Sequence, residues 1–433
     1  MAYTHRLSTL LVTGLIILLA LTACERPAQP ETEEEPAPRL GDWGIEIEHI
    51  AQDTRPGTDF NAFVNNGWIN AAEMPPGFSR FGAFTELALE AEDNVSAIIE
   101  SAQQKASSDP SAGPEQQIGD LYRAYMDTDA LNAKDLAPIQ NELEALLSLQ
   151  SHDEIARWMA KDGTNSLVGV YISQDAGNPE RYITHVTQSG LGLPNRDYYF
   201  RDDAPFPEHR EAYVDYIEGT LARAGIDQAR QRAEAIMALE TELAEVHWSR
   251  VQQRDRQANY NLKTFSELVD FAPDFDWKVF MAERGLDAIR EIVVTTDEAL
   301  QASAEIFGQT PVTTWQSYHA FHWINNHAPL LSNSYADAHF AFFRQRLGGV
   351  ESQRPRADRA VNFVSRRLGE LIGQVYVEKH FPPEYRAQME TLVSYLRRAF
   401  GERLENIEWM DDTTRQEALR KLEAFTPKIG YPD

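Results

Sequence analysis

The chain has 433 residues, and its hydrophobic fraction of 42% predicts a packed globular protein with enough length for more than one core. Its formal net charge is -27, with no run of Lys and Arg of the kind that neutralises phosphates, so the composition argues against nucleic acid as a partner. A single cysteine excludes an internal disulfide.

Residues 1–23 predict a secretory signal peptide. Arg6 supplies its positive charge, residues 10–21 form an apolar stretch, and Leu21-Thr22-Ala23-Cys24 follows. This tetrapeptide resembles a bacterial lipobox, which implies lipidation of Cys24 and a place in the cell envelope, facing the periplasm. The resemblance to lipoproteins also implies that Glu25 after the cysteine favours the outer membrane. A plain signal peptide and a membrane anchor are the alternatives, although the apolar stretch is short for a spanning helix.

Residues 24–39 are rich in Pro, Glu and Ala and include Glu33-Glu34-Glu35. Such a segment cannot bury enough apolar surface to fold, so we predict a tether between the lipid and the folded part.

The folded part is predicted to begin at residue 40, and its first informative segment runs from residue 55 to residue 84. Thr58 or Asp59 is predicted to cap a short helix whose apolar face contains Phe60 and Phe63. Asn66-Gly67 is predicted to end this helix in the left-handed conformation.

Beyond this segment the apolar residues recur at helical spacing. Helices are predicted over 82–105, 114–128, 137–148, 153–161, 208–225, 227–250, 264–270, 297–306, 314–325, 336–347 and 358–379. The runs 166–173 and 181–187, which are rich in β-branched and aromatic residues, predict one small β-hairpin.

Two further helices close the chain. Phe381-Pro382-Pro383-Glu384 starts the first, whose apolar stripe is predicted to be a buried face. The stripe consists of Met389, Leu392, Val393, Leu396, Phe400, Leu404 and Ile407. The second helix is predicted to start near Asp412 or Thr413, before a turn at residues 430–432.

Several blocks together resemble the neprilysin family of zinc metallopeptidases, over residues 40–433. The blocks are 55–60, 63–68, 75–84, 190–199, 247–250 with Arg254-Asp255, 368–370 through 376–377, 381–384 and 409–433. The resemblance implies a mainly α fold, namely a large multi-helix lid with a small β-hairpin. In the family this lid covers a thermolysin-like catalytic domain that begins beyond the block ending at Asp433, so we expect that domain to be absent from this chain.

The family's chemistry needs a His-Glu-x-x-His helix, in which two imidazoles bind zinc and the glutamate activates water. None of the 11 histidines of this chain is followed by glutamate. The complete family enzyme implies zinc as a cofactor, but we predict no zinc ligands and no catalytic residues in this chain.

Two other histidine arrangements could be imagined as metal sites. His319 and His322 lie three residues apart on a predicted helix, but aromatic neighbours favour a packed, hydrogen-bonded surface. His247 follows Glu242 and Glu245 on an amphipathic helix, where a structural hydrogen bond is the favoured role.

Arg80 is the candidate substrate-binding residue. Its block matches the segment in which the family places an arginine that binds the substrate carboxylate, and a guanidinium pairs with both oxygens of a carboxylate. An ordinary surface ion pair is the alternative. Thr85 stands where members of the resembled family often carry an acidic residue.

The sequence therefore predicts the N-terminal, substrate-enclosing domain (residues 40–433) of a secreted zinc metalloendopeptidase that cleaves small peptides. Without the catalytic half, the chain alone is predicted to be inactive. The alternative is a non-catalytic helical lipoprotein that binds peptides or a partner protein.

Overall fold

The computed structural model describes residues 46–108 and 113–432. The predicted signal peptide, Cys24 and the tether lie outside these residues. The chain divides into two compact units, one ending at Met74 and the other beginning at Pro75. Each unit is described by itself below.

The first unit contains the 3-10 helix η1 (Ile47–His49) and helix α2 (Phe60–Ala71). Asp59 caps α2, because its Oδ1 accepts a hydrogen bond from the amide of Ala62 at 2.9 Å. The predicted end at Asn66-Gly67 is wrong, since α2 continues to Ala71. Gly67 instead permits a close approach: a Cβ there would lie 2.3 Å from the carbonyl oxygen of His49.

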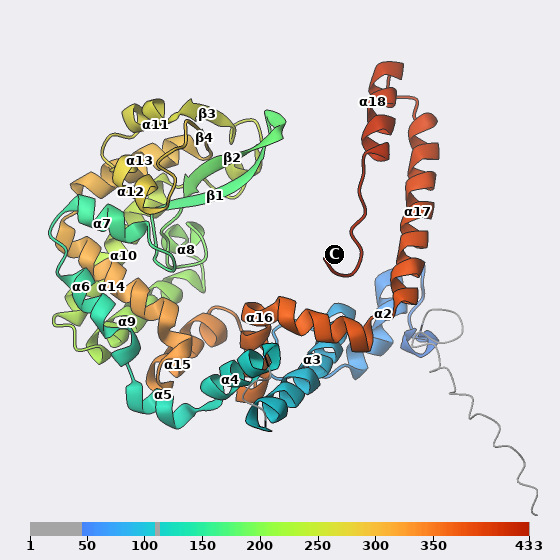
Figure 1. The fold of residues 1–433 in the computed structure, drawn as a ribbon, viewed down its shortest axis with the longest axis horizontal. Helices are drawn as coiled ribbons and strands as arrows, with labels where there is room; N and C mark the ends of the chain where they lie inside the picture. Colours follow the sequence, from blue (N-terminus) through green and yellow to red (C-terminus); the bar gives the residue numbers. More distant parts are fainter. Residues whose placement is uncertain (1–45, 109–112, 433) are drawn as a thin grey trace, which may run out of the picture. The chain divides into compact units, whose positions relative to one another are not determined.

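The second unit is built mainly of helices, which confirms the predicted fold class (Figure 1). Its helices are α3 (Ala83–Ser108), α4 (Pro114–Met126), α5 (Thr128–Lys134), η2 (Ala137–Ile139), α6 (Gln140–Leu147), α7 (His152–Met159), α8 (Asp197–Phe200), α9 (Phe206–Arg223), α10 (Ala229–Val246), η3 (Gln252–Arg254), α11 (Phe265–Phe271), α12 (Trp277–Glu283), α13 (Asp297–Gln309), α14 (Val312–His327), η4 (Ala328–Leu330), α15 (Asn333–His339), η5 (Phe340–Arg346), α16 (Arg356–His380), α17 (Pro383–Glu405) and α18 (Asp412–Glu423). Among the described helices, none is both long and apolar enough to span a membrane.

A four-stranded sheet includes the predicted hairpin. Strands β1 (Val168–Asp175) and β2 (Asn178–Gln188) are antiparallel neighbours, as predicted. Strand β4 (Glu291–Val294) runs parallel to β2, and β3 (Asn261–Thr264) pairs antiparallel with β4, so the order is β1-β2-β4-β3. The sheet therefore has two more strands than predicted. Strands β3 and β4 could not be recognised in the sequence, because four residues are too few to display a clear alternation of apolar and polar residues.

The largest core lies around the sheet and the helices α9, α10, α13 and α14. Its fully buried side chains include Leu243, Phe307, Trp315 and Phe321. Burial of such large apolar surfaces is the main stabilising contribution to the fold.

One carboxylate lies inside this core. Glu240 of α10 is fully buried and accepts hydrogen bonds from the hydroxyls of Tyr199 (2.6 Å) and Tyr213 (3.1 Å) and from the amide of Gly192 (3.2 Å). The Nε2 atom of His322 lies 2.8 Å from Oε1 of Glu240. Both oxygens are therefore satisfied, as burial of an ionisable group requires.

A separate core holds α3, α4 and α16 together. Ile98 and Ile99 of α3, Ile118 of α4, and Val361 and Val364 of α16 are buried against one another. This three-helix group carries much of the candidate site described below.

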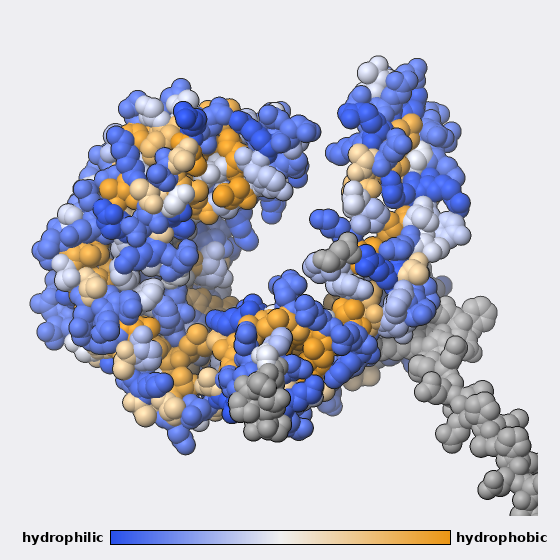
Figure 2. All heavy atoms as spheres, in the orientation of Figure 1, coloured by the Kyte–Doolittle hydropathy of each residue, from blue (hydrophilic) through white to orange (hydrophobic). Residues whose placement is uncertain are grey.

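The α17–α18 hairpin corrects the prediction of a buried face. Met389, Leu392, Leu396 and Phe400 are 43 to 60% exposed, and only Leu404 of the predicted stripe is buried. Figure 2 shows apolar and polar atoms mixed over this hairpin. The helical spacing of the stripe is real, but the described residues do not cover it.

Candidate functional site

The loop before α3 is fastened to the helices by one arginine. Gly77 has a φ of +85°, and a Cβ there would lie 2.1 Å from Cγ of Arg354. The guanidinium of Arg354 lies 5.3 Å from the ring centroid of Phe78 and pairs with Glu92 of α3 (2.9 Å) and Asp358 of α16 (3.3 Å). This clamp fixes the loop in which Arg80 lies.

Arg80 lines a cavity of about 710 Å³. Ser79 and Thr85 line the same wall as Arg80, while Tyr125 of α4 and several residues of α16 form a second wall. The remaining wall comes from η4, α15 and η5. The volume falls in the range of sites that bind small molecules or short peptide segments.

The charge of this cavity differs from that of the chain. Six of its lining residues are arginines and none is Asp or Glu, although the whole chain carries a net charge of -27. The six are Arg80, Arg344, Arg354, Arg359, Arg366 and Arg367. We name this set the arginine cavity.

Sequence reasoning missed five of these arginines. It found no basic run in the chain, yet the fold gathers arginines from the loop before α3, from η5, from the segment leading into α16 and from α16 itself. A usable signal was present, since residues 344–367 contain seven arginines and only two acidic residues.

Within the described residues, only one lining arginine has a carboxylate partner. That residue is Arg354, while Arg359 donates its Nε–H to the carbonyl oxygen of Arg354 at 3.2 Å. Arg367 stacks over the ring of Phe363 at 3.6 Å. Arg344 and Arg366 have exposed side chains with no hydrogen-bond or ion-pair partner in the described structure. Several guanidinium groups are therefore available to an anion.

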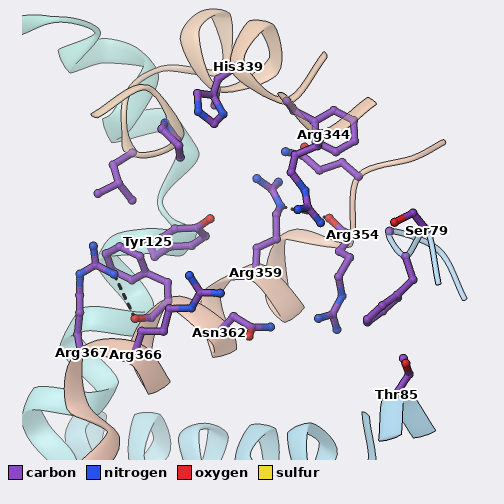
Figure 3. Close-up of a pocket in the computed structure, with 18 of the residues that line it drawn as sticks. Ser79, Thr85, Tyr125, His339, Arg344, Arg354, Arg359, Asn362, Arg366 and Arg367 are labelled. Carbon is purple, nitrogen blue, oxygen red and sulfur yellow. Dashed lines mark hydrogen bonds between the residues drawn. The ribbon is translucent and has the colours of Figure 1, made fainter. Parts of the chain in front are cut away.

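The close-up view shows how the cavity walls present these groups. Arg344 and Arg354 lie on one side, Arg366 and Arg367 lie on the other side near Tyr125, and Arg359 stands between them (Figure 3). Anionic groups of one ligand could thus meet guanidinium groups from either side.

The wall that carries Arg344 departs from the predicted α-helix over 336–347. Helix α15 ends at His339, and η5 continues it as a π-helix. Phe342 of η5 is buried, and its ring stacks on Tyr216 at 5.1 Å, whereas Arg344 is exposed at the cavity. The wider turn of a π-helix changes which side chains share a face, and this cannot be read from a 3.6-residue period.

His339 adds no charge to the cavity at neutral pH. Burial, together with the nearby positive charge of Arg344, lowers the pKa of His339 to about 4. The arginines alone therefore determine the charge of the cavity at neutral pH.

The predicted hydrogen bonding of the His319 and His322 pair holds for His322 but is wrong for His319, whose two buried ring nitrogens have no partner in the described structure. His322 has both ring nitrogens engaged, one by Glu240 and one by Asn165 at 3.0 Å. Burial lowers the pKa of His319 to about 3 and that of His247 to about 4, so both are neutral at pH 7.

The described residues do not fit a zinc ion. No group of three or more His, Cys, Asp or Glu side chains within 46–108 and 113–432 could hold a metal. His319 and His322 are packed among aromatic rings, and the imidazole of His322 is already used. We therefore assign no zinc-dependent step to these residues.

Comparisons with known proteins identify a family. Residues 56–432 match the model described as peptidase family M13. The chain is 27% identical over 394 residues to endothelin-converting enzyme 1 of Cavia porcellus, covering 87% of this chain and 52% of that protein. It is 25% identical over 422 residues to neprilysin of Homo sapiens, covering 89% of this chain and 55% of that protein. The chain thus spans about half the length of these relatives.

Solved structures agree with this match. The zinc metalloprotease ZMP1 of Mycobacterium tuberculosis, in complex with an inhibitor, superposes with a TM-score of 0.82 at 32% identity, covering 90% of this chain and 59% of that chain. PepO of Lactobacillus rhamnosis shares the fold, with a TM-score of 0.72 at 18% identity, covering 86% of this chain and 59% of that chain.

Proposed function

This chain belongs to peptidase family M13, and we propose that it forms the substrate-enclosing part of a zinc metalloendopeptidase that cleaves small peptides. The observation that carries the proposal is the cavity lined by Arg80, within a helical fold similar to that of a zinc metalloprotease. Zinc and the catalytic groups belong to the rest of the complete enzyme in this proposal.

Arg80 is proposed to bind the terminal carboxylate of a peptide. Its side chain is exposed, lines the cavity, and has no carboxylate partner in the described structure. A guanidinium forms two parallel charge-assisted hydrogen bonds with a carboxylate and remains charged at every physiological pH.

A thermodynamic cycle tests this role. Binding of a labelled short peptide with a free C-terminus is compared with binding of its amidated form, for the wild-type chain and for Arg80→Ala. We expect amidation to weaken binding to the wild type about tenfold and to have little effect on the variant. An equal effect of amidation on both proteins would count against the carboxylate role.

The exposed apolar stripe of α17 is evidence for a further domain that covers this helix. Its half-exposed side chains Met389, Leu392, Leu396 and Phe400 follow one helical stripe. We propose that a catalytic domain covers this stripe in a complete peptidase, since an apolar helical face is normally packed against another element and the described residues leave this one half-exposed.

The enzymatic part of the proposal is tested by activity. The purified chain, with and without added zinc, is expected to leave a fluorogenic short peptide intact and to bind no stoichiometric zinc. A chimaera in which residues 46–432 replace the matching part of the M. tuberculosis zinc metalloprotease is expected to cleave that peptide. Zinc-dependent cleavage by the chain alone would contradict the division of roles.

We also propose that lipid on Cys24 anchors the protein in the cell envelope, facing the periplasm from the outer membrane. The support is the lipobox-like sequence and the acidic tether behind it. Cys24→Ala is expected to move the chain from the membrane fraction to the soluble fraction. An unchanged distribution between the fractions would argue against the anchor.

A further inference from the structure

We propose that the arginine cavity selects acidic peptides, because arginines other than Arg80 bind carboxylates of peptide side chains. The residues assigned this role are Arg344, Arg359, Arg366 and Arg367. The inference rests on the proposed peptide-binding function and adds a substrate class to it.

The first argument is the lack of internal compensation. Arg354 shows how this fold neutralises an arginine that it uses for structure, since Glu92 and Asp358 both lie within ion-pair distance of it. Arg344 and Arg366 have no such partner in the described residues, although acidic residues far outnumber basic ones in the chain. Like charges that line one cavity repel each other, and a carboxylate ligand relieves that repulsion.

The second argument is geometry. The backbone of α16 presents Arg359 and Arg366 seven residues apart, which places them on the same face of a helix. Arg344 approaches from η5 on the other side of the cavity (Figure 3). A ligand with separated carboxylates can therefore meet guanidinium groups at more than one place.

The third argument favours peptides over nucleic acid. The aromatic wall residues Phe78, Tyr125 and Phe363 suit the apolar parts of a peptide. A long polyanion would also extend over a protein surface with a strong negative net charge, whereas a short peptide places its carboxylates only in the cavity.

The test compares two short labelled peptides with identical sequence except that one carries two glutamates where the other carries two glutamines. Both are acetylated and amidated, so neither offers the terminal carboxylate assigned to Arg80. Fluorescence anisotropy with the purified 433-residue chain measures their affinities. We expect the glutamate peptide to bind about tenfold more tightly at low salt, with the difference shrinking as ionic strength rises.

Two matched double variants locate the effect. Arg344→Ala with Arg366→Ala removes one unpartnered arginine from each side of the cavity. Arg256→Ala with Arg398→Ala removes the same charge at exposed arginines that do not line it. The first variant should lose the preference for glutamate and the second should keep it, while circular dichroism verifies that both fold.

Each other result overturns the proposal in a distinguishable way. Equal affinity for the two peptides would leave peptide binding intact but refute selection of acidic side chains. Binding of neither peptide would also refute selection of acidic side chains. It would refute the proposed peptide-enclosing function as well if a peptide with a free C-terminus likewise failed to bind. If the control variant lost the preference as strongly, general attraction of charge would replace the cavity as the cause. A short oligonucleotide that displaced the glutamate peptide more effectively than its unlabelled form would make nucleic acid the preferred ligand.

Discussion

The buried network around Glu240 and the arginine cavity handle charge in opposite ways. Glu240 is fully buried, and hydrogen bonds from Tyr199, Tyr213, Gly192 and His322 satisfy its two oxygens. In the cavity, Arg344 and Arg366 are exposed and have no partner in the described structure.

This difference separates structural charge from available charge. A buried carboxylate costs several kcal/mol unless the protein supplies its hydrogen bonds, so its partners are fixed by the fold. An exposed guanidinium keeps its hydration and needs no partner, which leaves it free to exchange water for a ligand. The comparison therefore predicts large effects on stability at the network and small ones at the cavity.

Substitution of Glu240 should have the largest effect. Glu240→Ala leaves two tyrosine hydroxyls, the amide of Gly192 and His322 without their acceptor, and we expect the free energy of unfolding to fall by about 3 kcal/mol or more. Glu240→Gln keeps the shape and one acceptor, so it should lose less. Urea denaturation measures both losses. A loss below about 1 kcal/mol for the alanine variant would contradict the structural role assigned to the charge of Glu240.

The second prediction concerns acid stability near the same network. His319 is buried, neither ring nitrogen has a partner in the described structure, and its folded-state pKa is about 3 against 6.5 when unfolded. Because the unfolded state binds the proton more readily, stability should fall as the pH drops through the window between about 6.5 and 3. Between pH 7 and pH 5 this residue accounts for about 2 kcal/mol.

His319→Phe tests that sign. The variant cannot bind the proton, so it should lose less stability than the wild type between pH 7 and pH 5, as measured by urea denaturation at each pH. Identical losses in the two proteins would show that His319 is protonated equally in the folded and unfolded states.

The sequence predicted much of the helical fold and one residue of the site. Long helices such as α3, α9 and α16 were found because their apolar spacing is a local property. Strands β3 and β4 were missed because four-residue strands gain their stability from pairing partners far along the chain. The arginine cavity was missed because its walls meet only after folding.

The α17 stripe shows the opposite failure. Its periodicity predicted a buried face, and that prediction was wrong for the described residues, because periodicity does not say what covers a face. Leu396 and Phe400 remain more than half exposed in the described structure. A pattern of this kind predicts an interface, and the proposed catalytic domain would supply its other side.

The third prediction concerns the one cavity arginine that has a structural role. Gly77→Ala places a Cβ against Arg354 at a backbone with φ of +85°, so we expect a loss of about 1 to 2 kcal/mol. Gly82 in the same loop is a matched control, since a Cβ there meets nothing within 4 Å. Gly82→Ala should change stability by less than about 0.5 kcal/mol in urea denaturation, and equal losses would refute the clamp.

The smallest effects should appear at the unpartnered arginines. Arg344→Ala and Arg366→Ala each remove a like charge without breaking an ion pair, so the free energy of unfolding should change by no more than about 0.5 kcal/mol. At low salt the change should be slightly stabilising, and it should vanish as salt screens the repulsion between the remaining guanidinium groups. A loss above about 1 kcal/mol would mean that these arginines stabilise the fold, and charge used in that way is not available to a ligand.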